Sequence, residues 1–281
     1  MSVSAADLPS ALVTAVDPAA DTSRADPTPA GTRYAVFLDY DGVLTPIVDR
    51  PEDAIITEEM AAVVRGLASR ATVCIVSGRD RAVIEQLSGL DDLIIAGSHG
   101  FDIHDPATGT IAHDASSGFE DLVATVTADV RDRAADVAGT LVEPKHASVA
   151  LHYRSVDPAE HGRVQEIVDG VLAEHPDELR VTPGKFVHEI QPKIDWNKGR
   201  AVEHLLGVLG LDGVDDTGRH VLPIYLGDDV TDEDAFRALA PRGGVGILVI
   251  DPSESGTRST DATATLADVD EVGRFLDGLA R

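Results

Sequence analysis

The strongest constraint on the fold is an apolar run at 35–38 that ends in the sequence Asp39-Tyr40-Asp41-Gly42. An uninterrupted apolar run bounded by turn residues predicts a buried strand. Side chains of an extended segment alternate between faces, so Asp39 and Asp41 would leave the strand end on the same side. Gly42 allows the backbone to turn sharply there. An acidic helix N-terminus would contain the same residues, so the rest of the chain must decide between the two interpretations.

Strand-like runs and helical periodicity alternate through much of the chain. Further strands are predicted at 72–76, 93–96, 221–226 and 245–250, and helices at 60–68, 83–87, 197–209 and 268–279, with Thr231 as the N-cap of one more helix. This alternation predicts an α/β fold, a Rossmann-like parallel-sheet core with helices on both faces.

The alternation changes in the middle of the chain. Helices at 119–130 and 164–172 are each followed by two strand-like runs, at 140–143 and 148–154 and then at 179–182 and 185–190, the last two joined by a Pro183-Gly184 turn. We therefore expect a small α+β domain inserted at 106–190 between two core segments, 31–105 and 191–281. Residues 1–30, rich in Ala, Asp, Ser, Thr and Pro, are expected to form a flexible leader.

The chain of 281 residues carries 49 acidic and 23 basic residues, a net charge of −26. Such a surface repels nucleic acid and anionic membranes, so neither is expected as a partner. It reflects either a salty cytoplasm or the compositional bias of a GC-rich coding sequence. There is no apolar run of the roughly 20 residues that span a bilayer, no signal peptide is recognised, and Cys74 is the single cysteine. We expect a cytoplasmic monomer.

Polar residues suited to chemistry follow predicted core strands or open a core helix. They are Asp39, Asp41, Ser77, Asn197, Lys198, Asp228, Asp229 and Asp232. Each group alone is an ordinary turn or helix start, but strand ends of a parallel sheet converge on one crevice. Several carboxylates with one hydroxyl and one ammonium suit phosphoryl transfer assisted by Mg²⁺.

The chemistry assigns each group a role. Asp39 would attack phosphorus and form an aspartyl-phosphate, and Asp41 would protonate the departing alkoxide and later deprotonate water. Lys198 and Ser77 would stabilise charge on the phosphoryl oxygens.

These motifs resemble those of haloacid dehalogenase superfamily phosphatases, in family order, with an insertion where that superfamily carries a C2-type cap. Within the superfamily the chain resembles the trehalose-6-phosphate phosphatases. The resemblance is carried by the motifs at 39–45, 76–79, 97–100, 152–154, 184–192, 197–199 and 227–233, and by Glu143 and Lys145.

The resemblance implies the last step of trehalose biosynthesis, hydrolysis of trehalose 6-phosphate with Mg²⁺ as cofactor and a small sugar phosphate as the partner. The metal would sit on Asp39, the Asp41 backbone carbonyl and Asp228, with Asp229 or Asp232 in support. Substrate-binding residues would be Tyr40, Gly78, Arg79, His99, Lys145, Arg154, Lys185, Glu189 and Asn197. No synthase-like domain precedes the phosphatase motifs, so a free-standing enzyme is expected.

Two departures and two alternatives remain open at this point. Many relatives have Phe where this chain has Tyr40, and Gln191 stands where a basic residue is frequent. The substrate could be another sugar phosphate, such as sucrose 6-phosphate. The chain could also be a non-catalytic relative that binds a sugar phosphate for regulation, although the intact motif residues argue against this.

Overall fold

The computed structural model describes residues 31–114, 118–145, 147–184, 186–251, 253 and 259–280. The predicted leader, 1–30, and Lys185 lie outside these residues. The described chain forms two compact units: one runs to Ala112 and resumes at Trp196, and the other spans His113–Asp195. The sequence-based boundaries were 106 and 190.

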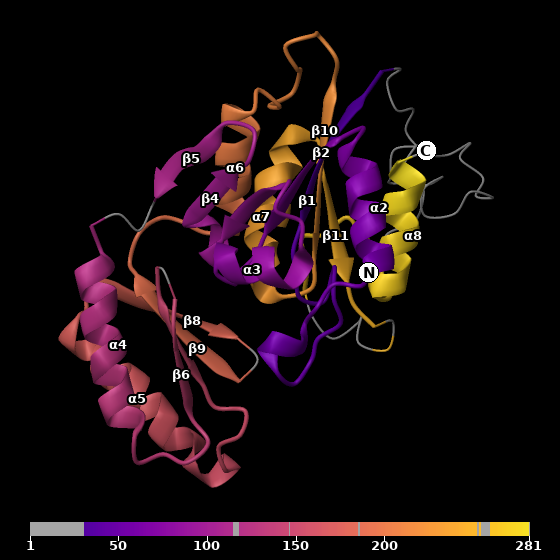
Figure 1. The fold of residues 1–281 in the computed structure, drawn as a ribbon. Coiled ribbons are helices and arrows are strands. Elements are labelled where there is room, and N and C mark those ends of the chain that lie inside the picture. The colour runs from indigo at the N-terminus through magenta and orange to yellow at the C-terminus, as the bar shows by residue number, and fades with distance from the viewer. Residues whose placement is uncertain are drawn as a thin grey trace. The chain divides into compact units, whose positions relative to one another are not determined.

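The first unit is built on an eight-stranded sheet of order β12-β11-β10-β1-β2-β3-β4-β5 (Figure 1). The strands are β1 (Arg33–Leu38), β2 (Thr72–Val76), β3 (Ile94–Gly97), β4 (Asp102–Asp105), β5 (Gly109–Asp114), β10 (Val221–Gly227), β11 (Val245–Val249) and β12 (Ala264–Leu266). Neighbours from β12 to β3 run parallel, whereas β3 and β4 pair antiparallel. The predicted parallel core is confirmed, and β4, β5 and β12 extend it beyond the prediction.

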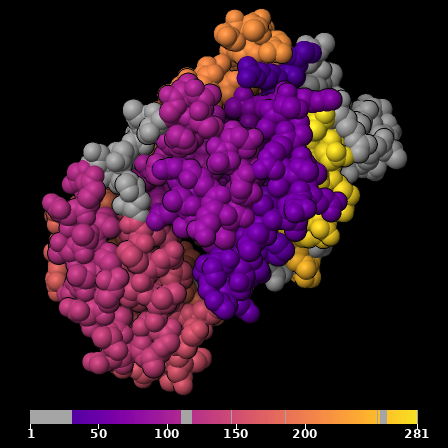
Figure 2. Space-filling view, in the orientation of Figure 1, coloured from indigo at the N-terminus to yellow at the C-terminus, as the bar shows by residue number. Residues whose placement is uncertain are grey.

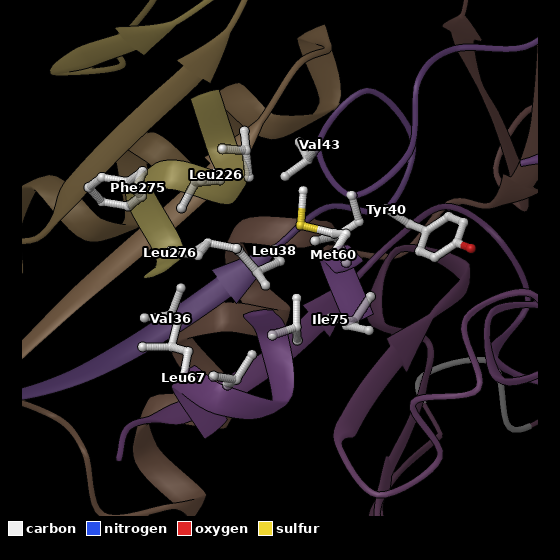
Figure 3. Packing of buried hydrophobic residues seen from close by; sticks show 14 of the residues in the cluster. Val36, Leu38, Tyr40, Val43, Met60, Leu67, Ile75, Leu226, Phe275 and Leu276 are labelled. Carbon is white, nitrogen blue, oxygen red and sulfur yellow. The ribbon is translucent and has the colours of Figure 1, made fainter. Parts of the chain in front are cut away.

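Helices cover both faces of this sheet, as predicted. They are α2 (Glu58–Ala68), α3 (Arg81–Ser88), α6 (Lys198–Val208), α7 (Glu233–Leu239) and α8 (Val269–Leu279). Side chains of β1 point alternately to the two faces of the sheet. Val36 and Leu38 pack with α2 and α8 (Figure 3), while Ala35 and Phe37 pack with α6 and α7. Because β1 is buried on both faces, its run is apolar without interruption.

The second unit repeats helix-strand-strand twice, as the sequence predicts. Its elements are α4 (Glu120–Ala134), β6 (Leu141–Pro144), β7 (Val149–His152), α5 (His161–Glu174), β8 (Leu179–Gly184) and β9 (Val187–Pro192). The strands form an antiparallel sheet of order β6-β7-β9-β8. The predicted Pro183-Gly184 turn is wrong: both residues pair with β9, so the chain reverses after Gly184.

The two faces of the smaller sheet differ in polarity. Leu151, Val181 and Ile190 belong to the apolar cluster that includes residues of α4 and α5. Glu143, Ala150 and Glu189 are cross-strand neighbours one residue out of phase with that set, so they lie on the opposite face. This second face is where the polar side chains of the unit gather.

The surface of the first unit includes its last helix. In the space-filling view, the yellow surface of α8 borders the indigo-to-purple surface of the N-terminal segments (Figure 2). α8 begins after Asp268, whose side chain accepts a hydrogen bond from the Glu271 amide and so caps it. Among the described residues, the helices are too short or too polar to traverse a lipid bilayer.

Candidate active site

The site lies at the carboxyl ends of the central strands of the large sheet. β1 is flanked by β10 and β2, with Leu38 in register with Leu226 on one side and Ile75 on the other. Asp39 follows directly, and its amide donates to the Leu226 carbonyl at 2.9 Å. Parallel strands of equal register therefore bring the residues after β1, β2 and β10 to one edge, as the sequence predicted.

Gly42 allows the loop after β1 to approach Asp228, the residue that follows β10, very closely. It has φ of 73°, a conformation that favours glycine. A Cβ at this position would lie 2.3 Å from Asp228 Oδ2, so any other residue would displace that carboxylate. The glycine thus allows the turn and the close approach of Asp228 at once.

Lys198, the first residue of α6, links two carboxylates. Its Nζ donates to Asp39 Oδ2 and Asp232 Oδ1, both at 2.7 Å, and Lys198 and Asp232 are 2% and 0% exposed. Burial lowers the pKa of Lys198, but the charges and hydrogen bonds of Asp232 and Asp39 outweigh it. Its pKa is therefore raised above the usual value, and the ammonium stays charged. Asn197 caps α6 by accepting from the Arg200 amide, which fixes Lys198 at the helix start.

Asp232 accepts hydrogen bonds on both carboxylate oxygens. Oδ1 receives Lys198 Nζ and the Tyr225 hydroxyl, each at 2.7 Å. Oδ2 receives the amides of Asp228 and Asp229 at 3.0 and 2.9 Å. Four donors fill the roughly four lone-pair positions of a carboxylate. Asp232 is thus an anchor for Lys198 and the loop after β10.

Tyr225 is a functional neighbour that the sequence interpretation missed. It lies within the buried strand β10, and its hydroxyl donates to Asp232. A phenol in an otherwise apolar buried strand must find a hydrogen-bond partner, which is the signal that could have identified it. A second correction concerns Thr231, which was predicted to cap the next helix. The N-cap of α7 is Asp232, and Thr231 lies within the preceding 3₁₀ turn Val230–Asp232 (η6), which Asp229 caps in a capping box with Asp232.

Three carboxylates are grouped so that they could hold a metal ion. One oxygen each from Asp39, Asp228 and Asp232 lies within 4.8 Å of the others. Burial raises the pKa of Asp39. The charge of Lys198 lowers this pKa in part, and the charge of Asp232 raises it further. Burial also raises the pKa of Asp228, and the charges of Asp39 and Asp232 add to this. A cation would relieve the repulsion, and because Asp232 is already fully hydrogen-bonded, Asp39 and Asp228 are the better direct ligands.

Asp41 follows Asp39 by two residues, and its carboxylate pairs with the guanidinium of Arg79. Arg79, which follows β2, donates from Nε to Asp41 Oδ2 at 2.6 Å and from a terminal nitrogen to Oδ1 at 2.7 Å. Tyr40 between the two aspartates has a fully buried ring, and its hydroxyl donates to the Ala54 carbonyl. Its side chain therefore holds the loop, and its amide donates to Asp39 Oδ1.

Ser77, Gly78 and His99 form a tight junction between the turns after β2 and β3. Ser77 is 2% exposed, and its carbonyl accepts the His99 amide at 2.7 Å. His99 has φ of 58°, uncommon for a residue with a side chain. A Cβ on Gly78 would lie 2.7 Å from the His99 ring, so this glycine lets the imidazole lie against the backbone beside Ser77.

The predicted sugar-binding residues of the second unit are partly grouped. Lys145 Nζ donates to Glu189 Oε2 at 3.1 Å, and Ser148 Oγ donates to Glu189 Oε1 at 2.7 Å. Arg154 lies over the Phe186 ring, 5.3 Å from its centroid. Ser148 was not among the predicted residues, and Glu143, which pairs with His152 at 2.7 Å, was not given a role.

Comparisons with known proteins agree on one family. A family model described as trehalose-phosphatase matches residues 37–270. The chain is 40% identical to probable trehalose-phosphate phosphatase 2 of Oryza sativa subsp. japonica, covering 89% of this chain and 69% of that protein. It is also 40% identical to trehalose 6-phosphate phosphatase RA3 of Zea mays, with coverage of 89% and 70%.

Solved structures support the same fold. The C-terminal domain of Candida albicans trehalose-6-phosphate phosphatase matches with a TM-score of 0.75 at 24% identity, covering 89% of this chain and 93% of that one. A structure of Aspergillus fumigatus trehalose-6-phosphate phosphatase matches with a TM-score of 0.57 at 27% identity, with coverage of 88% and 92%.

Proposed function

Because the chain belongs to the trehalose-phosphatase family, we propose that it converts trehalose 6-phosphate and water into trehalose and inorganic phosphate. The observation that carries the proposal is the buried link from Asp39 through Lys198 to Asp232, in a chain whose family match spans 37–270. A relative that only binds sugar phosphates would have no need of the Asp39 carboxylate at this position, because its charge repels the phosphate.

In the first step, Asp39 attacks the phosphorus and displaces the sugar oxygen, giving an aspartyl-phosphate. Lys198 Nζ, 2.7 Å from Asp39 Oδ2, orients this carboxylate and offers positive charge to the phosphoryl oxygens. Ser77 and the amides of the adjoining turn would donate hydrogen bonds to the same oxygens. We assign supporting roles to three further residues. Gly78 and His99 pack against one another in the turns after β2 and β3, and Asn197 caps the helix that begins with Lys198.

Asp41 carries the proton in both steps. Its protonated carboxyl gives a proton to the sugar oxygen as the P–O bond breaks, so the sugar leaves as an alcohol. The resulting carboxylate then takes a proton from the water that attacks the aspartyl-phosphate. Phosphate is released, Asp39 is regenerated, and Asp41 is protonated again for the next cycle.

We propose Mg²⁺ as the resident cation, held by Asp39, Asp228 and the Asp41 backbone carbonyl, with Asp232 and Asp229 supporting these ligands. Its contribution when bound is positive charge that lets a phosphate dianion approach the Asp39 carboxylate. The raised pKa values of Asp39 and Asp228 support this assignment, because burial and the neighbouring carboxylates disfavour their charged forms and a cation would offset both effects.

We further propose that the insert predicted at 106–190 is a cap that recognises the sugar through Lys145 and Glu189, with Arg154 and Lys185 as additional contacts. The Lys145–Glu189 pair supports this, since its side chains are both 11% exposed and present polar atoms on the face without helices. We also propose a cytoplasmic monomer that binds neither nucleic acid nor membranes, in keeping with the net charge of −26 and the one buried cysteine.

The test is phosphate release from a panel of trehalose 6-phosphate, sucrose 6-phosphate and glucose 6-phosphate with Mg²⁺. We expect kcat/KM to be highest for trehalose 6-phosphate, by about 10-fold or more. A higher kcat/KM for another sugar phosphate would identify that compound as the substrate instead. Binding of a sugar phosphate without release of phosphate would favour a regulatory role.

A further inference from the structure

The guanidinium of Arg79 grips the carboxylate of Asp41 with two parallel hydrogen bonds, at 2.6 and 2.7 Å. The two side chains are only 16% and 31% exposed. Paired N–H···O bonds of this kind fix the plane of a carboxylate as well as its position. Asp41 would otherwise rotate about two side-chain torsions at the edge of the sheet.

Arg79 is itself held by several parts of the first unit. Its amide donates to Ser77 Oγ at 3.3 Å, and its carbonyl accepts the Ser98 amide at 2.7 Å. A terminal nitrogen donates to the Pro51 carbonyl at 2.8 Å, which ties the guanidinium to the loop beyond the first aspartates. The guanidinium also lies 5.8 Å from the Tyr40 ring centroid.

We propose that Arg79 is the positioning residue of Asp41, and that its side chain serves the proton donor rather than the sugar. This inference rests on the proposed function. Sequence resemblance suggested Arg79 as a substrate-binding residue, but three of its N–H groups already engage Asp41 and Pro51. These bonds set the plane and position of the guanidinium within the first unit.

The geometry is compatible with proton transfer. A carboxyl oxygen that carries a proton still has an acceptor lone pair, so Arg79 can hold Asp41 before and after the proton leaves. The proton passes from Asp41 to the ester oxygen as the P–O bond breaks, and Asp41 later regains a proton from water. A displacement of about 1 Å at such a donor can cost on the order of 100-fold in rate.

The experiment separates positioning from binding by varying the basicity of the leaving group between two aryl esters that differ only in a para nitro group. It compares kcat/KM for para-nitrophenyl phosphate and phenyl phosphate with Mg²⁺, because kcat/KM reports formation of the phosphoenzyme. Nitrophenolate departs readily without a proton, whereas phenolate is more basic and benefits from one. The Arg79→Lys variant keeps the positive charge but loses the planar pair of N–H donors that binds both carboxylate oxygens.

We expect Arg79→Lys to lower kcat/KM for phenyl phosphate by about 10- to 100-fold and for para-nitrophenyl phosphate by less than about 3-fold. The double variant with Asp41→Asn should be no slower than Asp41→Asn alone, within about 2-fold, because both changes remove the same function. Activity on para-nitrophenyl phosphate also reports that the variant is folded; if Arg79→Lys fails to fold, Arg79→Gln provides the same comparison.

The matched control is Arg81→Lys, two residues along, where the arginine pairs with Glu85 and Asp102. It should lose the same small factor on both esters. An equal loss on both esters in Arg79→Lys, additive losses in the double variant, or the same selectivity in Arg81→Lys would overturn the proposal. The wild-type enzyme could hydrolyse the aryl phosphates but not trehalose 6-phosphate. That result would contradict the proposed substrate, and the comparison of the two aryl esters would still test the role of Arg79. A chain inert toward every ester would overturn both.

Discussion

At the scale of single residues, the site is organised by buried charge. Lys198 joins Asp39 to Asp232, and Asp232 in turn accepts from Tyr225 and two backbone amides. Buried ions of this kind are costly unless each has hydrogen-bonded partners. The network therefore fixes the carboxylate of Asp39 in one orientation, which a nucleophile requires.

Replacement of the nucleophile gives the first prediction. Asp39→Asn keeps the size of the side chain and one of its two acceptor oxygens but removes the attacking anion. We expect turnover of trehalose 6-phosphate to fall by on the order of 10³-fold or more, with thermal unfolding close to wild type. Asp49→Asn, at an exposed position of the following loop, is the matched control. Near-normal turnover of folded Asp39→Asn would rule out a covalent mechanism.

The second prediction concerns pH and metal. Burial first, and then neighbouring carboxylates, raise the pKa of Asp39 to about 7 and of Asp228 to about 8, against about 4 when unfolded. Above pH 4 the unfolded chain releases these protons while the folded, metal-free protein retains them. Their contribution to stability is therefore present at low pH and is lost as the pH rises toward 8.

Mg²⁺ should reverse this loss by replacing the protons. We expect Mg²⁺ at about 100 times its Kd to raise the unfolding temperature by about 5 °C at pH 8, and by less at pH 6, relative to a chelator. The shift should largely disappear in Asp228→Asn, while an exposed control, Asp92→Asn, should retain it. An equal shift in both variants would mean that the cation binds elsewhere.

At the scale of elements, the two sheets offer different kinds of surface because of their geometry. Strand ends of a parallel sheet gather backbone amides and carboxylates at one edge, which suits the shared phosphoryl group. An antiparallel sheet with helices on one face leaves its other face for polar side chains. On that face, Glu189 of β9 holds Lys145 and Ser148 by hydrogen bonds.

The third prediction belongs to β9. Glu189→Ala should lower kcat/KM for trehalose 6-phosphate by about 10- to 100-fold, because sugar hydroxyls and Lys145 lose their acceptor. Hydrolysis of para-nitrophenyl phosphate, which needs only the large-sheet residues, should change much less. Glu166→Ala, an exposed substitution on α5, is the control. Equal losses on both substrates would remove this face from the specificity argument.

At the scale of the whole molecule, the dominant property is the net charge of −26. Like charges on a compact surface repel one another and destabilise the folded state. Salt shortens the range of this repulsion, from about 10 Å at 0.1 M to about 3 Å at 1 M.

The fourth prediction is that the unfolding temperature rises with KCl, most steeply below about 0.5 M, where screening changes fastest. Sucrose at matched osmolarity serves as the uncharged control. A flat response to KCl would favour compositional bias, rather than adaptation to a salty cytoplasm, as the origin of the acidic surface.

The sequence by itself indicated the βα order of the central strands, the helix-strand-strand repeat in the middle of the chain and the gathering of Asp39, Lys198 and Asp232. Helical and strand periodicities are local, and β2 at Thr72–Val76 could be delimited from them alone. Residues that follow parallel strands must meet at one edge whatever the details of packing. These features need no knowledge of which distant side chains touch.

Only the tertiary structure decided the pairings between distant residues. The grip of Arg79 on Asp41, the bond of Tyr225 to Asp232 and the exclusion of a side chain at Gly42 depend on strand register and loop path. The short strands β4 and β12 pair with a neighbouring edge, and an alternation over only three or four residues is too short to identify a strand from the sequence. Local sequence patterns cannot specify these contacts, because each depends on segments distant in the chain that folding alone brings together.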